Sequence, residues 1–350
     1  MWTILQTCKN SHFSVLWLTS STMDVVLYAF KNVILPVEIV GGSILNIIAL
    51  SIWCFGPKSK QLQCAVYFAT LSLIDTVLLA FPGVVLIFIL FDKASLPTET
   101  AFCKLHSFSS HFLLHCSNWI VAATTIDRTL TVLFPFTFRA KKIRMRSIKI
   151  IAAIISIVAL AQFPRFIMSE KSTIFCAINE KYRDFVLWYS LVWDMTVCLL
   201  LPFTAVISCN VASVVVSFKR RGKQRNVSNS RLLNSTNVFS KLVIGTGVTF
   251  ILANTLWVFC KIAEITKFDF LLLEAGSATH TVGNILVYFN NFMNPIIYCM
   301  LTTTARDDIK HAIHVMTRAC HIHKTTIDLQ RNTTENRQSE RPPVYLISRQ

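Results

Sequence analysis

The sequence predicts an all-α membrane protein, a bundle of seven transmembrane helices followed by a short amphipathic eighth helix. Hydrophobic residues make up 53% of the 350 residues and charged residues only 15%, which is too apolar for a soluble domain of this length. Seven apolar stretches are also long enough to cross a bilayer, which takes about 20 residues in a helix. They lie at 33–55, 62–90, 104–134, 147–168, 186–217, 239–262 and 278–301.

Helices are the predicted spanning form because these continuous apolar runs lack the alternation of a β-barrel strand. Several runs contain Asp, Asn or His, so we expect them to pack together around a polar interior. We therefore predict four regions along the chain. They are an extracellular N-terminus at 1–32, a membrane domain at 33–301, an amphipathic helix at 302–323 and a disordered cytoplasmic tail at 324–350.

The net charge of +16 is unevenly distributed along the chain. Basic residues concentrate in the loops and the tail on one side, which predicts an extracellular N-terminus and a cytoplasmic C-terminus and argues against a nucleic-acid partner. We interpret the longest basic run, 219–225, as a signal that orients the chain in the membrane and that also contacts anionic membrane lipids. Contact with a partner protein is the alternative that the run leaves open.

The segment after the last span has its own helical pattern. Ile309, Ile313 and Met316 recur at helical spacing, which predicts an amphipathic helix on the inner leaflet. Cys320 near its end is a candidate for lipidation, and a free cytoplasmic thiol is the alternative.

Polar residues within the apolar stretches are the candidate functional residues. The last stretch contains Asn294-Pro295-Ile296-Ile297-Tyr298, and the second contains a lone acid, Asp75. Pro295 removes a backbone hydrogen bond and bends the helix. Asn294, Tyr298 and Asp75 place polar groups at a depth where they are costly and usually functional. A kinked helix with satisfied polar side chains is the alternative for the pentapeptide alone.

In their order and placement, these motifs resemble those of the rhodopsin-like (class A) G-protein-coupled receptors. The resemblance covers about 33–320. It rests on Asn46, Asp75, Cys103, Asp127-Arg128-Thr129, Cys176, Pro202, Phe250 and the pentapeptide 294–298.

The resemblance implies a switch that activates a heterotrimeric G protein, with arrestin as a second cytoplasmic partner. Its residues are Asp127, Arg128, Thr129, Asn294, Pro295 and Tyr298. Asp127 would form a charge pair with the neighbouring Arg128 until a rearrangement frees the arginine. The resemblance also implies a plasma-membrane location.

Two further features follow from the resemblance. Cys103 and Cys176 would form an extracellular disulfide bond. Asp75 would lie near Ser117, Asn290, Asn291 and Asn294, where the family often holds a sodium ion. A protonated Asp75 bonded to Asn294 is the alternative, since a buried carboxylate must be neutralised, paired or bound to a cation.

The chain departs from the family in several places, which indicates a divergent member. Thr129 stands where a Tyr is usual, and Asn210 replaces another Tyr. The fourth span has no Trp. The sixth has Asn254 in place of the usual Trp, and no proline occurs between 203 and 294.

Two single positions argue against two classes of ligand. Ser110 stands where an amine receptor has a carboxylate, and Tyr288 where an opsin has a lysine. The outer mouth instead has side chains of both charges, which suits a peptide, as in neuropeptide signalling. The candidate ligand-binding residues are Ser110, His111, Asp194, Lys261, Glu264 and Tyr288, with His106, Arg165 and His280 nearby. Residues 174–178 could pair as a β-hairpin over this mouth. A small non-amine molecule or a lipid is the alternative.

Other classes of protein fit less well. An enzyme is disfavoured because there is no Gly-rich phosphate loop and the spans contain no paired carboxylates, and we expect no cofactor beyond a sodium ion. A seven-span transporter would explain a buried Asp, but transporters of this kind are expected to contain internal repeats, which the sequence lacks.

Overall fold

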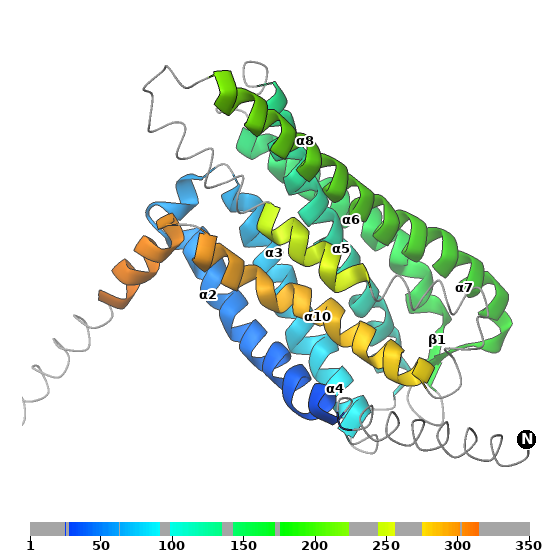
Figure 1. Ribbon diagram of the computed structural model, residues 1–350. Coiled ribbons are helices and arrows are strands. Elements are labelled where there is room, and N and C mark those ends of the chain that lie inside the picture. The colour runs from blue at the N-terminus through cyan, green and yellow to red at the C-terminus, as the bar shows by residue number, and fades with distance from the viewer. Residues whose placement is uncertain are drawn as a thin grey trace, which may run out of the picture.

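The computed structural model describes residues 25, 28–62, 64–91, 99–134, 143–171, 176–223, 244–255, 275–301 and 303–314. Within these ranges, each of the seven predicted spans contains a helix (Figure 1). The predicted residues Lys261, Glu264 and Cys320 lie outside the described residues.

The first two spans both combine α-helix with π-helix. The first consists of η1 (Phe30–Ile34), η2 (Val37–Gly41) and α2 (Gly42–Phe55), and the second of α3 (Ala65–Leu78), η4 (Leu79–Gly83) and α4 (Val84–Phe91). Pro82 lies inside η4. A proline has no N–H to complete the α-helical ladder, so a local shift to wider hydrogen bonding at this point is expected.

The third and fourth spans are single long helices, α5 (Thr100–Leu133) and α6 (Ile143–Met168). The fifth span is assembled from α7 (Arg183–Tyr189), η7 (Ser190–Leu200) and α8 (Leu201–Lys223). The sixth is described over Ile244–Thr255, and the seventh is α10 (Ala275–Leu301). Pro202 is the second residue of α8, and Pro295 lies inside α10.

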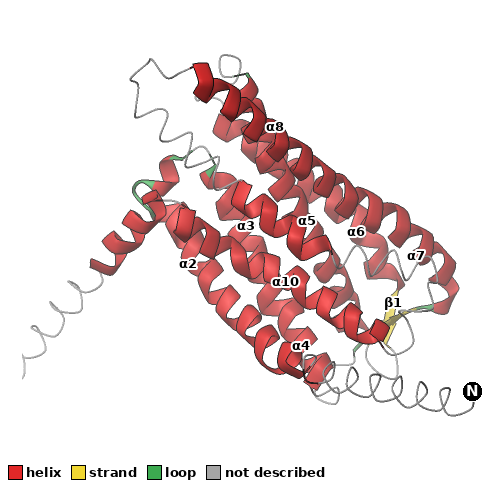
Figure 2. Ribbon diagram, in the orientation of Figure 1, coloured by secondary structure: helices red, strands yellow, loops and turns green. Residues whose placement is uncertain are grey.

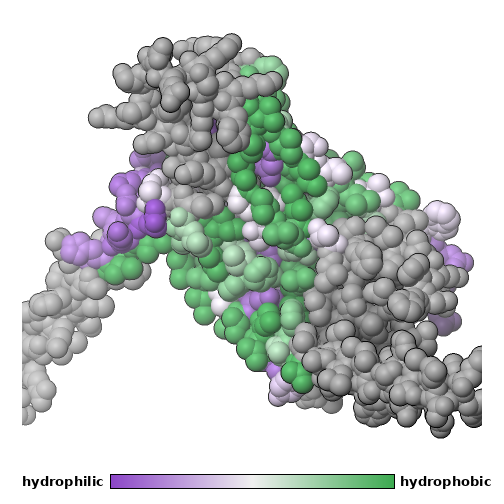
Figure 3. Space-filling model, viewed as in Figure 1, coloured by the Kyte–Doolittle hydropathy of each residue, from purple (hydrophilic) through white to green (hydrophobic). Residues whose placement is uncertain are grey.

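The third span occupies the middle of the bundle. α5 packs against α3, α6 and α8, whereas α2 packs against α3 and α10. The main apolar core forms where these helices meet and includes Phe68, Leu71, Ile120 and Phe250. Many large apolar side chains face outward instead, and Figure 3 shows broad hydrophobic surfaces along the helices. Such surfaces are expected where the helices face lipid tails rather than water.

A short hairpin is the β-structure in the described residues (Figure 2). β1 (Ser169–Lys171) pairs antiparallel with β2 (Cys176–Ile178), with Lys171 opposite Cys176. The predicted strand is confirmed at 176–178, whereas Ile174 and Phe175 lie outside the described residues. β1 packs against α5, whose residue Cys103 is buried and disulfide-bonded.

A further helix, Thr303–His314, follows α10 at a bend of 86°. Asp308 joins it to the loop after α2: the backbone N–H of Ser59 donates to Asp308 Oδ2 at 2.7 Å, and the N–H of Lys58 lies 3.3 Å from both carboxylate oxygens. A Cβ atom at Gly56 would lie 2.5 Å from Asp308 Oδ2. Only a glycine therefore leaves room for this contact.

Candidate functional site

Two buried carboxylates, Asp75 and Asp194, each gather a polar network within the bundle. Asp75 belongs to the second span and Asp194 to the fifth. The two side chains are 0% and 5% exposed. Because buried carboxylates are costly in a membrane domain, each network is a candidate functional site.

The Asp75 network joins the second, third and seventh spans. Ser117 Oγ lies 2.8 Å from Asp75 Oδ1 and 3.2 Å from Asn291 Oδ1. Asn294 Nδ2 donates to Asp75 Oδ2 at 2.7 Å. Asn46 in the first span donates to the backbone carbonyl of Asn291 at 3.0 Å. The structure therefore brings together Asp75, Ser117, Asn291 and Asn294, as the sequence predicted.

The two donors to the Asp75 carboxylate, Ser117 and Asn294, are both neutral. Among the ion pairs of the described residues, none includes Asp75. Ser72 Oγ, Asn290 Oδ1 and Asn294 Oδ1 are buried oxygens without a hydrogen-bond partner in the described chain. Hard cations prefer oxygen ligands of this kind, so the residues present fit a sodium ion. Sequence reasoning had not assigned Ser72 to the site, although it lies one helical turn before Asp75.

Tyr298 lies among aromatic side chains at the inner end of α10. It is 1% exposed. Its ring centroid lies 4.6 Å from that of Phe68 and 5.7 Å from that of Trp53. The hydroxyl is buried and has no hydrogen-bond partner among the described residues. The packing holds this ring in place, while the hydroxyl is left with unused hydrogen-bonding capacity.

The predicted ion pair between Asp127 and Arg128 is wrong, because Asp127 pairs with a different arginine. The Asp127 carboxylate forms its ion pair with Arg146, from the start of α6. No ion pair between Asp127 and Arg128 occurs in the described part of the chain. Consecutive side chains on a helix do not face each other, so adjacency in sequence does not produce a contact. Arg128 itself is buried.

Thr129 still forms hydrogen bonds, as expected for the residue in place of the usual Tyr. Its Oγ1 lies 2.9 Å from Ser213 Oγ and 3.2 Å from the backbone oxygen of Cys209, both in α8. Asn210, the other substituted position, is buried with neither amide atom hydrogen-bonded within the described chain. The third and fifth spans are therefore joined at Thr129 and not at Asn210.

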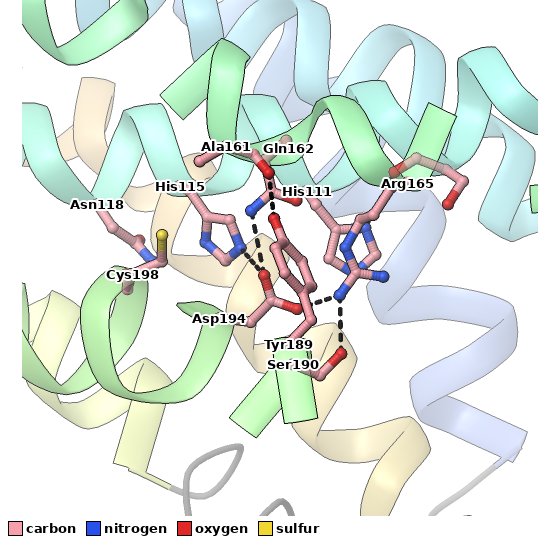
Figure 4. A network of polar contacts seen from close by, with 11 residues as sticks. His111, His115, Asn118, Ala161, Gln162, Arg165, Tyr189, Ser190, Asp194 and Cys198 are labelled. Atoms are coloured by element: carbon pink, nitrogen blue, oxygen red, sulfur yellow. Dashed lines mark hydrogen bonds and ion pairs between the residues drawn. The ribbon is translucent and has the colours of Figure 1, made fainter. Parts of the chain in front are cut away.

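The Asp194 network joins the third, fourth and fifth spans (Figure 4) and lies one helical turn from the start of β1. His115 Nε2 and Gln162 Nε2 each lie 3.1 Å from Asp194 Oδ1, and Arg165 Nη2 binds Asp194 Oδ2. Arg165 Nη2 also donates to Ser190 Oγ at 3.1 Å. The carboxylate that we predicted to bind the ligand is thus bound to the protein's own cation.

Two members of this network, His115 and Gln162, were missed by sequence reasoning. A signal was present, because His111 and His115 are four residues apart on α5, and Gln162 and Arg165 are three apart on α6. Residues at these spacings share one helix face. The rings of His111 and His115 are 6.1 Å apart, so the predicted His111 lies beside the network.

Of the predicted ligand-binding residues that the structure describes, Ser110 and Tyr288 are not hydrogen-bonded to Asp194. Ser110 Oγ donates to the backbone oxygen of His106 at 2.6 Å, within its own helix. Tyr288 packs against the main apolar core and against a second, smaller apolar cluster that includes Leu79 and Ile285. Of the residues predicted at this mouth, the structure therefore joins Arg165 to Asp194 and places His111 beside them.

With these features in place, comparison with known proteins assigns the chain to a family. The family described as 7 transmembrane receptor (rhodopsin family) matches residues 45–298, most of the chain. The chain therefore belongs to this family: it is a class A G-protein-coupled receptor with a seven-helix membrane bundle, and not an enzyme.

Two relatives illustrate how distant the similarity is. The chain is 23% identical to the human G-protein coupled receptor 65 over 285 residues, which is 76% of this chain and 81% of the relative. It is 21% identical to the C5a anaphylatoxin chemotactic receptor 1 of Oncorhynchus mykiss over 283 residues, 77% of each chain.

Proposed function

We propose that this receptor binds an extracellular ligand and activates a heterotrimeric G protein at its cytoplasmic face. The observation that carries the proposal is the 2.7 Å hydrogen bond between Asn294 and Asp75. It ties the proline-containing seventh span to the second span at a buried charge. A change in the charge state or partners of Asp75 would therefore alter the position of the seventh span at Pro295 and Tyr298.

The ligand is expected to enter from the side of the β1–β2 hairpin, and the N-terminus is expected to be extracellular. A peptide is the proposed ligand class, because this end has exposed charges of both signs, including Glu170, Lys181 and Asp184, beside the Arg165–Asp194 ion pair. Several polar partners of both signs suit peptide termini and backbone. A small non-amine molecule or a lipid would be indicated if no peptide activates the receptor.

The experiment is GTP exchange on a G protein co-expressed with the full chain at the plasma membrane. Agonist-dependent exchange is the expected result, and Arg128→Ala should reduce it by about 100-fold or more while ligand binding persists. Arg144→Ala, an exposed position near the start of α6, is the matched control. Substrate uptake without nucleotide exchange would overturn the proposal in favour of a transporter.

The disulfide of Cys103 is proposed to be with Cys176, because Cys176 begins the strand that pairs with β1, and β1 packs on the helix that carries Cys103. If so, Cys103→Ser and Cys176→Ser each reduce surface expression as much as the double variant, since one bond is lost in every case. Additive losses would contradict the pairing.

A sodium ion at Asp75 is the proposed allosteric cofactor. Asp75, Ser117, Ser72 and the side-chain oxygens of Asn290 and Asn294 would hold it. When bound, the ion would supply the positive charge that these neutral partners do not. Arrestin is proposed as a further cytoplasmic partner.

A further inference from the structure

We infer that Arg165 is a subsite for a carboxylate group of the ligand. The inference rests on the proposed function and names the chemistry of its ligand. Its starting point is the unequal use of hydrogen-bonding capacity by the two members of the Arg165–Asp194 ion pair.

Asp194 has little capacity left for a ligand. Its two oxygens already receive donors from His115, Gln162 and Arg165, and a carboxylate has about four acceptor positions. A cationic ligand group would have to displace Arg165 from this carboxylate. It would then leave a guanidinium group uncompensated at a buried position, which is costly.

Arg165 has capacity to spare. It is 8% exposed, and its hydrogen bonds to Ser190 and Asp194 both use Nη2. The Nε–H is buried and has no hydrogen-bond partner among the described residues. An unsatisfied buried donor is unfavourable, so an acceptor that reaches Nε adds to the network without breaking it.

The guanidinium group is also held in position for such a contact. Its central carbon lies 5.7 Å from the centroid of the Tyr189 ring, and the Tyr189 hydroxyl donates to the backbone oxygen of Ala161. Ser169 Oγ bonds the backbone oxygen of Arg165 at 2.8 Å, so Arg165 lies one turn below the start of the hairpin. Figure 4 shows the Arg165 side chain reaching Asp194 and Ser190.

The charge of the network selects the class of acceptor. Asp194 balances the charge of Arg165, and the two histidines beside it, His111 and His115, carry no negative charge. The network therefore favours an anion over a cation. A monoanionic carboxylate suits this site, because guanidinium N–H groups form strong charge-assisted hydrogen bonds to carboxylates and the buried Nε–H has no partner among the described residues. The carboxylate could be a peptide C-terminus or that of a free organic acid.

The test measures thermal unfolding of the purified full chain in lipid nanodiscs, without a G protein. One set of probes is a collection of short peptides with free C-terminal carboxylates, matched with the same peptides amidated. The second set is a panel of organic acids matched with their methyl esters. We expect at least one acid to raise the unfolding temperature, with an affinity about ten-fold or more above that of its neutral counterpart.

If the stabilising acid is one of the peptides, the carboxylate that binds Arg165 is a peptide C-terminus. If it belongs to the second set, the ligand is a free organic acid. Arg165→Lys keeps a positive charge beside Asp194 but lacks the Nε–H, so it should fold and lose most of the acid preference. Arg165→Gln should lose all of it. Arg144→Gln, an exposed arginine near the start of the same helix, should retain the preference.

Three results would overturn the inference: neutral counterparts that bind as well as the acids, an acid preference that survives in Arg165→Lys and Arg165→Gln, or no stabilisation by any acid. Because the measurement contains no G protein, a failure of GTP exchange leaves it unaffected. An acid that stabilises the chain without promoting exchange would count against the proposed function alone.

Discussion

The two buried carboxylates differ in how the protein compensates their charge. Asp194 is held by Arg165, with His115 and Gln162 completing its bonds. Asp75 is held by Ser117 and Asn294, which are neutral, and the Oδ1 atom of Asn294 is buried without a hydrogen-bond partner among the described residues. Both are essentially removed from water, so burial alone does not explain the difference.

The difference indicates separate roles. A carboxylate with its own cation forms a fixed link among three spans, because breaking the ion pair would leave a buried charge without a counter-charge. A carboxylate with only neutral partners can change its state by taking up a proton or a metal ion. The Asp194 network is therefore suited to anchoring and to the proposed ligand recognition, and the Asp75 network to switching.

The largest expected effect comes from Asp194→Asn, which leaves Arg165 buried without its counter-charge. Loss of one partner of a buried ion pair costs about 3–5 kcal/mol of unfolding free energy. Thermal unfolding of the purified receptor measures the loss, and Asp184→Asn at an exposed position of α7 is the control. The double variant Asp194→Asn/Arg165→Gln should recover part of the stability. An Asp194→Asn variant as stable as the wild type would show that the ion pair is not the anchor.

The same chemical change at Asp75 should act in the opposite direction. In sodium-free buffer, Asp75→Asn should unfold at the same temperature as the wild type or higher, because it removes a buried charge that has only neutral partners. Agonist affinity of the wild type should fall about ten-fold as sodium rises, and the variant should lose this dependence. If sodium has equal effects on both proteins, the role assigned to the Asp75 network is wrong.

A smaller effect is expected from the Asp127–Arg146 pair, whose side chains are 14% and 29% exposed. A double-mutant cycle with Asp127→Asn and Arg146→Gln should give a coupling energy of about 1 kcal/mol. The matched cycle with Asp127→Asn and Arg128→Gln should give a coupling near zero. A larger coupling in the second cycle would restore the neighbouring Arg128 as the partner.

The smallest effect is expected at Lys58 and Asp307, which form an exposed ion pair of 2.7 Å. The hydrogen bond from Lys58 lowers the pKa of Asp307, and the same bond raises the pKa of Lys58. The pair therefore contributes to stability above the pKa of the Asp307 carboxyl group. That contribution is lost as the pH falls through this pKa, or rises through that of Lys58.

Water and salt screen such an exposed pair. Asp307→Ala should consequently leave the unfolding temperature unchanged at neutral pH. Asp308→Ala, which removes the acceptor for two backbone N–H groups, should lower it. Equal losses in the two variants would contradict this ranking.

Much of the Asp75 site could be predicted from sequence because its residues lie in recognisable motifs. Asp75, Asn294 and Tyr298 each belong to a pattern with a characteristic place in its span. Ser72 could not be assigned to the site. Sequence also could not show which side-chain oxygens lack a hydrogen-bond partner, because a motif does not tell which lone pairs remain unfilled. That depends on the rotation of each helix against its neighbours.

The Asp194 site was less predictable. Asp194 was recognised as a costly acid, but its partners His115, Gln162 and Arg165 come from two other spans. Helical spacing shows that such residues share a face, and it does not show which helix that face meets. The Asp127–Arg128 pair was mispredicted for a related reason: neighbours in sequence diverge on a helix, while Arg146 reaches Asp127 from another span.

The sequence by itself determined the class of this protein. Apolar runs long enough to span a bilayer require helices, because the backbone must satisfy its hydrogen bonds internally, and the ordered motifs within them identify the receptor family. The tertiary structure decided how each buried charge is compensated. That outcome depends on distances of a few ångströms between side chains on different helices, and those distances exist only once the bundle has packed.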